Sequence, residues 1–316
     1  MRRLTIAVVV LLGCVTAFAS DPPQRPRIFG IARVELFTSD LRAANEFYSP
    51  VLGMMRPSNC PAGCDKLPPS RAFSVNGLQE IALSPMPSTP PVNLVKEITF
   101  ATDDIDALRR YVEYHKIPVK LTDLSKTRAR DQRPLTILDP EGHKISFVEW
   151  RKSTSELLPE YSKMYDIIHA GFVVRDRAAE DNFYQGVLGF HPYWHGGMKD
   201  DQTDWVSLQV PDGTDWIEFM VSVAPDADHH TLGVMNHIAI GVADIQKADK
   251  EISARWLKPH DAPKLGRDGK WQLNLYDPDD TRVEFMEFLP KEKPCCSEYT
   301  GQHPGSSGSA SVPSKP

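Results

Sequence analysis

The sequence has no surplus of basic residues and no long apolar run. Lysine and arginine number 36 against 42 acidic residues, which gives a net charge of -6 at pH 7, and no arginine-rich run is present. We therefore expect no nucleic-acid partner, because such binding depends on clustered positive charge. No apolar stretch reaches the ~20 residues that cross a bilayer, so we expect no integral membrane segment.

Cysteine is also scarce, with 5 residues in the whole chain. Cys60 and Cys64 flank a Pro-Ala-Gly loop, where they could close a small disulfide in an oxidising compartment. A zinc site would need two more soft ligands nearby, and none follow. The adjacent Cys295 and Cys296 leave three states open: a vicinal bridge, an intermolecular bond or free thiols.

The N-terminal residues have the three parts of an export sequence. Residues 1–3 are positively charged at two positions, residues 4–15 are almost wholly apolar, and Ala17-Phe18-Ala19 offers small residues at a cleavage position. This pattern predicts a signal peptide over residues 1–19 and export to the periplasm or the medium. Leu11-Leu12-Gly13-Cys14 weakly resembles a lipoprotein box, so lipidation at Cys14 is the alternative.

The strongest organisational feature is an internal repeat. The 316 residues suit about two domains, and three sequence matches recur in the same order at offsets of 136, 140 and 138 residues. They are Glu46–Met54 with Asn182–Phe190, Asp104-Ile105 with Asp244-Ile245, and Asp139-Pro140 with Asp277-Pro278. Such matches indicate two copies of one domain.

We place the two copies at residues 26–150 and 165–290, with residues 152–162 as a polar linker. Residues 291–316 have little to bury, so we expect a disordered tail there. Hydrophobic periodicity and turn residues predict an α+β fold in which each copy runs strand, helix, strands, twice over. In the second copy we expect strands at 167–174, 205–210, 216–221, 237–242, 271–275 and 282–289, and helices at 176–189 and 245–256.

In the motifs of these elements, the sequence resembles the vicinal oxygen chelate superfamily. The similarity lies in His-x-x-Phe-Val-Val-x-Asp, Phe-Tyr-x-x-Val-Leu-Gly-Phe, His-Ile-Ala-Ile-x-Val-x-Asp-Ile and Asp-Pro-x-x-x-x-x-Glu. The superfamily includes glyoxalase I, extradiol dioxygenases and the bleomycin- and fosfomycin-resistance proteins. The resemblance covers about residues 28–289 and implies four βαβββ units that form two curved, half-open barrels.

The resemblance also implies a divalent metal ion in the second copy. Carried onto this sequence, its ligand positions are His169, Glu218, His237 and Glu284. Imidazole and carboxylate together suit Fe, Mn, Ni, Co or Zn. Glu284 shares one face of its strand with Met286 and Phe288, so a carboxylate there would lie on an otherwise apolar face and need a cation as partner.

The first copy has a different set at the matching positions, namely Arg33, Glu80, Glu97 and Ser146. Arginine cannot bind a metal ion and serine is a poor ligand. We therefore expect the first copy to be a degenerate domain without metal. His229 and His230 lie in a polar loop before the His237 strand, where they are either acid–base groups or exposed residues.

Three activities on a small-molecule substrate follow from the resemblance, and the oligomeric state stays open. In a glyoxalase-like lyase or isomerase, Glu218 and Glu284 would be ligands and catalytic groups in proton transfer. In an Fe(II) extradiol-type dioxygenase, His169, His237 and Glu284 would suffice, but this sequence has Glu218 and Asn274 where the resemblance implies a histidine and a tyrosine. In a resistance-type binding protein, Trp194, Trp205, Trp216 and Trp271 would line the groove.

Overall fold

The computed structural model describes residues 22–55, 71–121, 134–150 and 165–305. The predicted signal peptide, the Cys60 and Cys64 loop, the linker and residues 306–316 lie outside these ranges. Among the described helices, none combines the length and the apolarity that a membrane span requires.

The described part of the first copy forms a seven-stranded mixed sheet in the order β2-β3-β1-β4-β7-β6-β5. Two antiparallel neighbours at its centre, β1 and β4, join the two halves of the copy. The elements are β1 (Ile28–Thr38), α1 (Leu41–Glu46), η1 (Phe47–Val51), β2 (Ala72–Ser74), β3 (Glu80–Pro85), β4 (Val95–Thr102), α2 (Ile105–Tyr114), β5 (Lys120–Leu121), β6 (Leu135–Leu138) and β7 (Lys144–Glu149).

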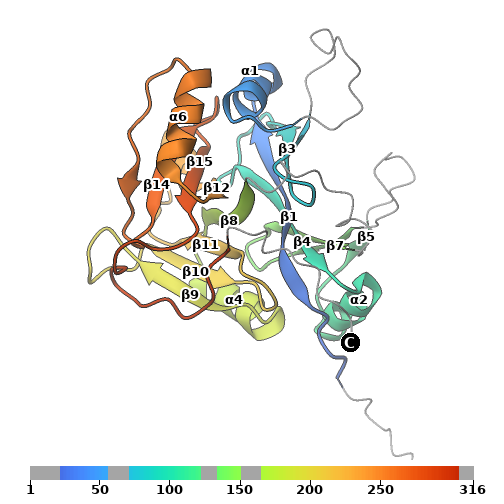
Figure 1. Ribbon diagram of the computed structural model, residues 1–316. Helices are drawn as coiled ribbons and strands as arrows, with labels where there is room; N and C mark the ends of the chain where they lie inside the picture. The colour runs from blue at the N-terminus through green and yellow to red at the C-terminus, as the bar shows by residue number, and fades with distance from the viewer. Residues whose placement is uncertain (1–21, 56–70, 122–133, 151–164, 306–316) are drawn as a thin grey trace, which may run out of the picture.

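The second copy repeats this plan in an eight-stranded sheet that curls into a half-barrel, in the order β13-β14-β15-β12-β8-β11-β10-β9 (Figure 1). Its elements are β8 (Asp166–Val173), α4 (Arg177–Asp181), η5 (Asn182–Val187), β9 (His191–Gly196), β10 (Trp205–Gln209), β11 (Trp216–Met220), α5 (His229–Met235), β12 (His237–Val242), α6 (Ile245–Arg255), β13 (Lys264–Leu265), β14 (Trp271–Tyr276) and β15 (Arg282–Glu287). The predicted tandem α+β fold is confirmed, although β9, β13 and α5 were not predicted. His229 and His230, expected in a polar loop, begin α5.

The repeat is visible in how the helices start and end. An aspartate caps the first turn of α1, α2, α4 and α6 by accepting hydrogen bonds from backbone N–H groups, and these caps are Asp40, Asp104, Asp176 and Asp244. In both copies the helix that carries the Phe-Tyr pair widens into a π-turn. It ends at a glycine with positive φ, 77° at Gly53 and 79° at Gly189.

The two copies share one apolar core and exchange equivalent contacts. Gln79, just before β3, accepts a hydrogen bond from the backbone N–H of Ile167 at 2.7 Å. Asp215, just before β11, accepts one from the backbone N–H of Ile31 at 2.8 Å. Buried side chains of both sheets belong to the same hydrophobic cluster, and in Figure 1 α1 lies beside α6 at one end of the molecule. The copies are therefore packed as partners.

Residues 291–305, here called the C-terminal segment, contradict the prediction of a disordered tail from residue 291. The backbone N–H of Thr300 donates to the carbonyl of Tyr193 in β9 at 3.0 Å. The hydroxyl of Ser297 bonds both the N–H and the carbonyl of His195, at 2.9 and 3.0 Å. Tyr299 packs against the apolar cluster on the inner face of the half-barrel. Residues 291–316 are polar on average, and this average composition gave no indication of the packing of Tyr299 or of the backbone hydrogen bonds.

Of the three states left open for Cys295 and Cys296, the structure has the vicinal disulfide. The carbonyl of Cys295 accepts a hydrogen bond of 3.2 Å from the indole N–H of Trp194. The backbone N–H of Cys295 donates to the carbonyl of Arg267 at 2.9 Å. The disulfide therefore lies against the half-barrel, near β9 and the turn between β13 and β14.

Candidate metal centre

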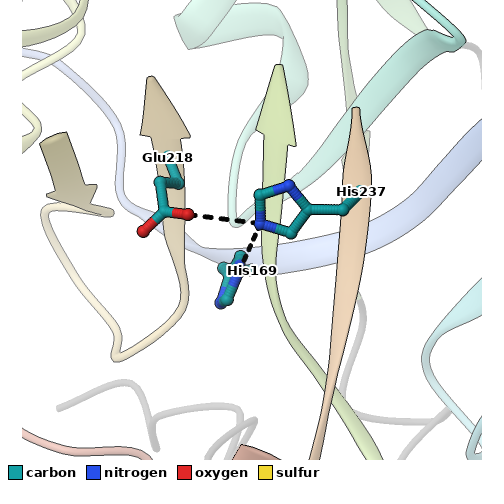
Figure 2. Close-up of side chains that lie close together, drawn as sticks. All are labelled: His169, Glu218 and His237. Carbon is teal, nitrogen blue, oxygen red and sulfur yellow. Dashed lines mark hydrogen bonds and ion pairs between the residues drawn. The ribbon is translucent and has the colours of Figure 1, made fainter. Parts of the chain in front are cut away.

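Four neighbouring strands of the curled sheet, β15, β12, β8 and β11, supply the four predicted ligand residues. The antiparallel register places Ala239 opposite His169, and Gly171 opposite His237. The parallel register places Glu218 opposite Gly171 and Glu284 opposite Ala239. These side chains consequently project from one face of the sheet, as Figure 2 shows for His169, Glu218 and His237.

The side-chain tips converge on a small volume. The Nε2 atoms of His169 and His237 lie 3.0 Å apart, and Nε2 of His237 lies 3.2 Å from Oε2 of Glu218. Nε2 of His169 lies 3.5 Å from Oε2 of Glu284. Potential ligand atoms of His169, Glu218 and His237 all lie within 4.8 Å of one another. Glu284 is outside this group of three and contacts it through His169.

These separations fit ligands of one metal ion. With metal–ligand bonds of about 2.1 Å, adjacent ligands lie about 3.0 Å apart at a right angle and about 3.4 Å apart at a tetrahedral angle. Nε2 of His237 is also the ring atom with a free lone pair, because its Nδ1–H is placed to donate to the carbonyl of Met235 at 3.2 Å. The geometry and the donor types therefore match a divalent ion bound between the two imidazoles.

The electrostatic environment supports the same reading. Burial lowers the pKa of both His169 and His237 well below the ordinary value of 6.5, which favours the neutral, metal-binding form of each imidazole. Burial raises the pKa of Glu284 to about 7. Its side chain is only 4% exposed, whereas that of Glu218 is 12% exposed. A cation would offset the cost of placing these carboxylates on a largely apolar face.

Gly171 makes room for the site, and the sequence analysis did not single it out. A Cβ atom at this position would lie 1.9 Å from Cε1 of His237. Any larger side chain would displace the imidazole. The sequence held a clue, because this glycine interrupts a β8 strand of larger residues two positions after His169.

The first copy has ion pairs at the corresponding place. The Arg33 guanidinium lies 3.4 Å from Glu80 and 3.7 Å from Glu35, and Lys144 lies 3.1 Å from Glu97. The hydroxyl of Ser146 shares a hydrogen bond of 2.7 Å with Thr136. These carboxylates have cationic side chains as partners.

The match of Glu80 with Glu218 is wrong by two residues. Glu80 pairs with Arg33, whereas the residue opposite His169 is Trp216. Glu35 of the first copy corresponds to Gly171 of the second. Glu35 pairs with Ala82, whereas Gly171 pairs with Glu218, so Ala82 is the counterpart of Glu218. A count of residues along the chain could not reveal this shift, because the loops before β3 and β11 differ in length.

The other candidate residues divide into two groups. Trp194, Trp205 and Trp216 gather in one cluster on the inner face of the half-barrel, but Trp271 packs against the shared core instead. His229 and His230 are exposed at the start of α5, where His230 lies 3.1 Å from Asp280. Both histidines are therefore exposed, and neither lies among the converging ligands.

A second group of potential ligands, Asp139, His143 and Glu180, lies between the two copies. Asp139 already accepts hydrogen bonds from the N–H and the ring of His143, at 2.7 and 2.6 Å, and from Tyr184 at 3.2 Å. Burial, together with the charge of Asp139, raises the pKa of Glu180 to about 8. We interpret this group as a hydrogen-bond network, because the lone pairs of Asp139 have partners.

Comparison with known families gives two matches along the chain. The model of the family described as the Glyoxalase/Bleomycin resistance protein/Dioxygenase superfamily matches residues 30–147 and 166–285. These ranges lie within the two copies inferred from the internal repeat. No curated protein matches the sequence.

Solved structures with the same fold include several dioxygenases. A halotolerant catechol dioxygenase is 16% identical with a TM-score of 0.60, and the match covers 88% of this chain and 95% of that one. A catechol 2,3-dioxygenase is 13% identical with a TM-score of 0.61, covering 84% and 96%. A variant of homoprotocatechuate 2,3-dioxygenase from Brevibacterium fuscum is 18% identical with a TM-score of 0.60, covering 89% and 74%. At these identities the likeness establishes the tandem fold alone.

Proposed function

The chain belongs to the glyoxalase/bleomycin resistance protein/dioxygenase superfamily, and from this membership we propose that it is a metal-dependent lyase or isomerase of the glyoxalase-like type. Its substrate would be a small molecule with two adjacent oxygen atoms. The observation that carries the proposal is the position of Glu218, whose carboxylate lies 3.2 Å from Nε2 of His237. If Glu218 were a fourth ligand, four protein groups would hold the ion, and a dioxygenase needs that position for dioxygen beside the substrate oxygens.

His169, Glu218, His237 and Glu284 would hold a divalent ion such as Fe, Mn, Ni, Co or Zn. When bound, this ion would act as a Lewis acid. It would polarise the substrate oxygens and stabilise the negative charge that forms when a neighbouring carbon loses a proton.

The two glutamates have different environments, and we assign them different roles. Glu218 is the more exposed, and the hydroxyl of Ser207 donates to its Oε1 at 3.3 Å. We assign proton transfer with the substrate to Glu218, because a general base must reach the proton that it removes. Glu284, the more buried of the two, would hold the ion and serve as the second proton carrier.

An extradiol-type dioxygenase is the second candidate, and the tandem arrangement shared with dioxygenase structures favours it. In that case His169, His237 and Glu284 would form the ligand set and Glu218 would stay unbound. The side chain of Asn274, from the strand position opposite Glu284, has an Oδ1 atom buried without a hydrogen-bond partner. The resemblance implies a tyrosine at this position for ring cleavage, so Asn274 departs from that pattern, as Glu218 does.

Small-molecule binding without catalysis is the third candidate. Trp194 and Trp205 stack with ring centroids 6.4 Å apart in the cluster that also contains Trp216. Aromatic side chains of this kind provide binding surface. Metal content separates this candidate from the other two, since a binding-only protein needs no stoichiometric ion.

Anaerobic reconstitution with single metal ions tests the proposal. The reconstituted protein is supplied with catechols or with 2-oxoaldehyde adducts, and product formation and oxygen uptake are followed together. We expect turnover of an adduct without oxygen uptake, and its loss in Glu218→Gln but not in the first-copy control Glu80→Gln. Oxygen consumption with Fe(II) and a catechol, retained in Glu218→Gln, would establish the dioxygenase instead.

We also propose that the protein acts after export, supported by the three-part pattern of residues 1–19. Mass spectrometry of the protein from a periplasmic fraction is expected to give a chain that starts at Ser20. A lipid-modified chain starting at Cys14, or an uncleaved chain in the cytoplasm, would contradict this prediction.

A further inference from the structure

The two imidazoles of the proposed metal centre are oriented in different ways. Nδ1 of His237 has the carbonyl of Met235 as hydrogen-bond partner at 3.2 Å. Nδ1 of His169 is buried and has no hydrogen-bond partner. A metal-binding histidine is usually oriented by a hydrogen bond on its second ring nitrogen. Packing must therefore fix the His169 ring.

The indole of Trp216 lies against that ring. The two ring centroids are 4.7 Å apart with an angle of 31° between the planes, and the two residues are direct neighbours in the parallel register of β8 and β11. His237 meets His169 edge-on, with centroids 5.0 Å apart. His237 and Glu284 meet the edge of the His169 ring, and Trp216 covers its face.

Trp216 is in turn held by a buried lysine and a tyrosine. The ammonium of Lys270 lies 4.7 Å from the Trp216 ring centroid. The ring centroids of Tyr193 and Trp216 lie 4.9 Å apart. Lys270 is fully buried and its Nζ donates to the hydroxyl of Tyr193 at 3.3 Å. Cation–π attraction is strongest where the cation is shielded from water.

The C-terminal segment completes this arrangement. The ring of Tyr299 lies 4.8 Å from Tyr193 and 5.3 Å from the ammonium of Lys270, and its hydroxyl donates to the backbone carbonyl of Asp268 at 2.9 Å. The hydroxyl of Tyr193 shares a hydrogen bond of 2.7 Å with Nδ1 of His303. His169, Trp216, Tyr193 and Tyr299 thus form a continuous aromatic column that ends beyond the family match at residue 285.

We propose that Trp216 is a positioning residue that sets the orientation of the His169 imidazole, and that Lys270 and Tyr299 hold Trp216 in place. The C-terminal segment thereby contributes to metal binding without supplying a ligand. This inference rests on the proposed metal centre, because the orientation of His169 matters only if its Nε2 binds an ion.

The test compares variants by Co²⁺ binding. Co²⁺ affinity is measured by competition with a chelator, and the visible absorption spectrum reports the ligand geometry. We expect Trp216→Leu to weaken Co²⁺ affinity about 10–100-fold and to change the spectrum, as loss of an outer-shell partner does. Trp216→Phe, which keeps a ring, should restore most of the affinity. Tyr299→Leu should fall between Trp216→Leu and the parent.

Trp205→Leu is the matched control, because Trp205 packs against the same inner-face cluster but stacks on Trp194 instead of His169. Thermal unfolding of each metal-free variant shows whether it folds. Should Trp216→Leu fail to fold, Tyr299→Leu decides. Parent-like affinity and spectrum in the folded leucine variants of Trp216 and Tyr299, or an equal loss in Trp205→Leu, would overturn the inference.

A metal-free measurement separates this inference from the proposed function. NOESY spectra of the metal-free protein report whether the ring protons of His169 keep fixed contacts with the His237 ring in the parent and lose them in Trp216→Leu. If the parent binds no Co²⁺, the proposed function fails, and the NMR comparison still decides whether Trp216 orients the ring. If the parent binds Co²⁺ and Trp216→Leu is unchanged by both methods, only the positioning role fails.

Discussion

The hydroxyl of Tyr48 in the first copy donates a hydrogen bond of 3.0 Å to the carboxylate of Asp277 in the second. The reciprocal bond joins Tyr184 of the second copy to Asp139 of the first at 3.2 Å. All four side chains are buried. The Phe-Tyr helix and the Asp-Pro turn, the two motifs that revealed the repeat, are thus each other's binding partners across the two copies.

Removing either hydroxyl should therefore weaken the contact between the copies. We expect Tyr48→Phe and Tyr184→Phe each to lower the free energy of unfolding by about 1–3 kcal/mol, because a buried acceptor loses a donor. Tyr114→Phe on the exposed side of α2 is the control and should leave stability unchanged. Chemical denaturation followed by fluorescence checks both, and equal stability of all three variants would contradict the prediction.

Metal content should depend on the second copy alone. We expect the purified protein to hold about one divalent ion per chain. His169→Ala or His237→Ala should remove the ion, because each variant lacks one of the four predicted ligands. Arg33→Ala, at the equivalent place in the first copy, should retain the ion. Elemental analysis of the intact, folded proteins gives the answer, and a folded parent without metal would exclude the proposed enzyme.

Gly171→Ala should abolish metal binding while the protein still folds. The added methyl group would lie 1.9 Å from the His237 ring, which must turn away from His169. Gly186→Ala is the control, because its nearest neighbour is the flexible end of Asn182 at 3.1 Å. Equilibrium dialysis against Zn²⁺, with circular dichroism to verify folding, distinguishes the two variants. Parent-like Zn²⁺ binding by Gly171→Ala would disprove the assigned role of the glycine.

The stability of the metal-free protein should fall as the pH rises from about 4.5 to about 8, partly because of Glu180. Burial and the nearby Asp139 raise the pKa of Glu180 from an ordinary 4.5 to about 8. Between these two pH values the folded state keeps a proton that the unfolded state has released, so this contribution to stability is lost progressively from pH 4.5 upward and is gone at about pH 8.

The variant Glu180→Gln, which cannot lose a proton, should show a smaller decrease in melting temperature between pH 6 and pH 9. Glu113→Gln, on the exposed surface of α2, should follow the parent. Melting temperatures measured in the presence of EDTA provide the comparison. A Glu180→Gln curve parallel to that of the parent would show that this carboxyl group carries no such proton.

Much of the fold could be predicted because its determinants are local and occur twice. The capping aspartates, the Phe-Tyr helices and the Asp-Pro turns mark element boundaries in the sequence itself, and their constant order reveals the tandem arrangement. Strand β9 was missed because His191–Gly196 mixes proline, histidine and glycine with aromatic residues. Its place in the sheet depends on pairing with β10 rather than on its own composition.

The candidate site was predictable for its ligand types and less so for their surroundings. His169 and His237 stand out as polar residues on apolar strands, and the resemblance supplied their partners. The role of Trp216 could not be inferred, since the distance between its ring and that of His169 depends on strand register. Lys270 reads as an ordinary surface residue in the sequence, and only three-dimensional packing shows that three aromatic rings surround its ammonium group.

The hydrogen bonds between the C-terminal segment and β9 have a consequence for self-association. β9 is the outermost strand of its sheet, and an open outer strand is a template on which another molecule can add a strand of its own. Thr300 and Ser297 occupy backbone groups of Tyr193 and His195 that such an addition would use. The same segment that completes the aromatic column through Tyr299 thus also discourages edge-to-edge aggregation of the protein.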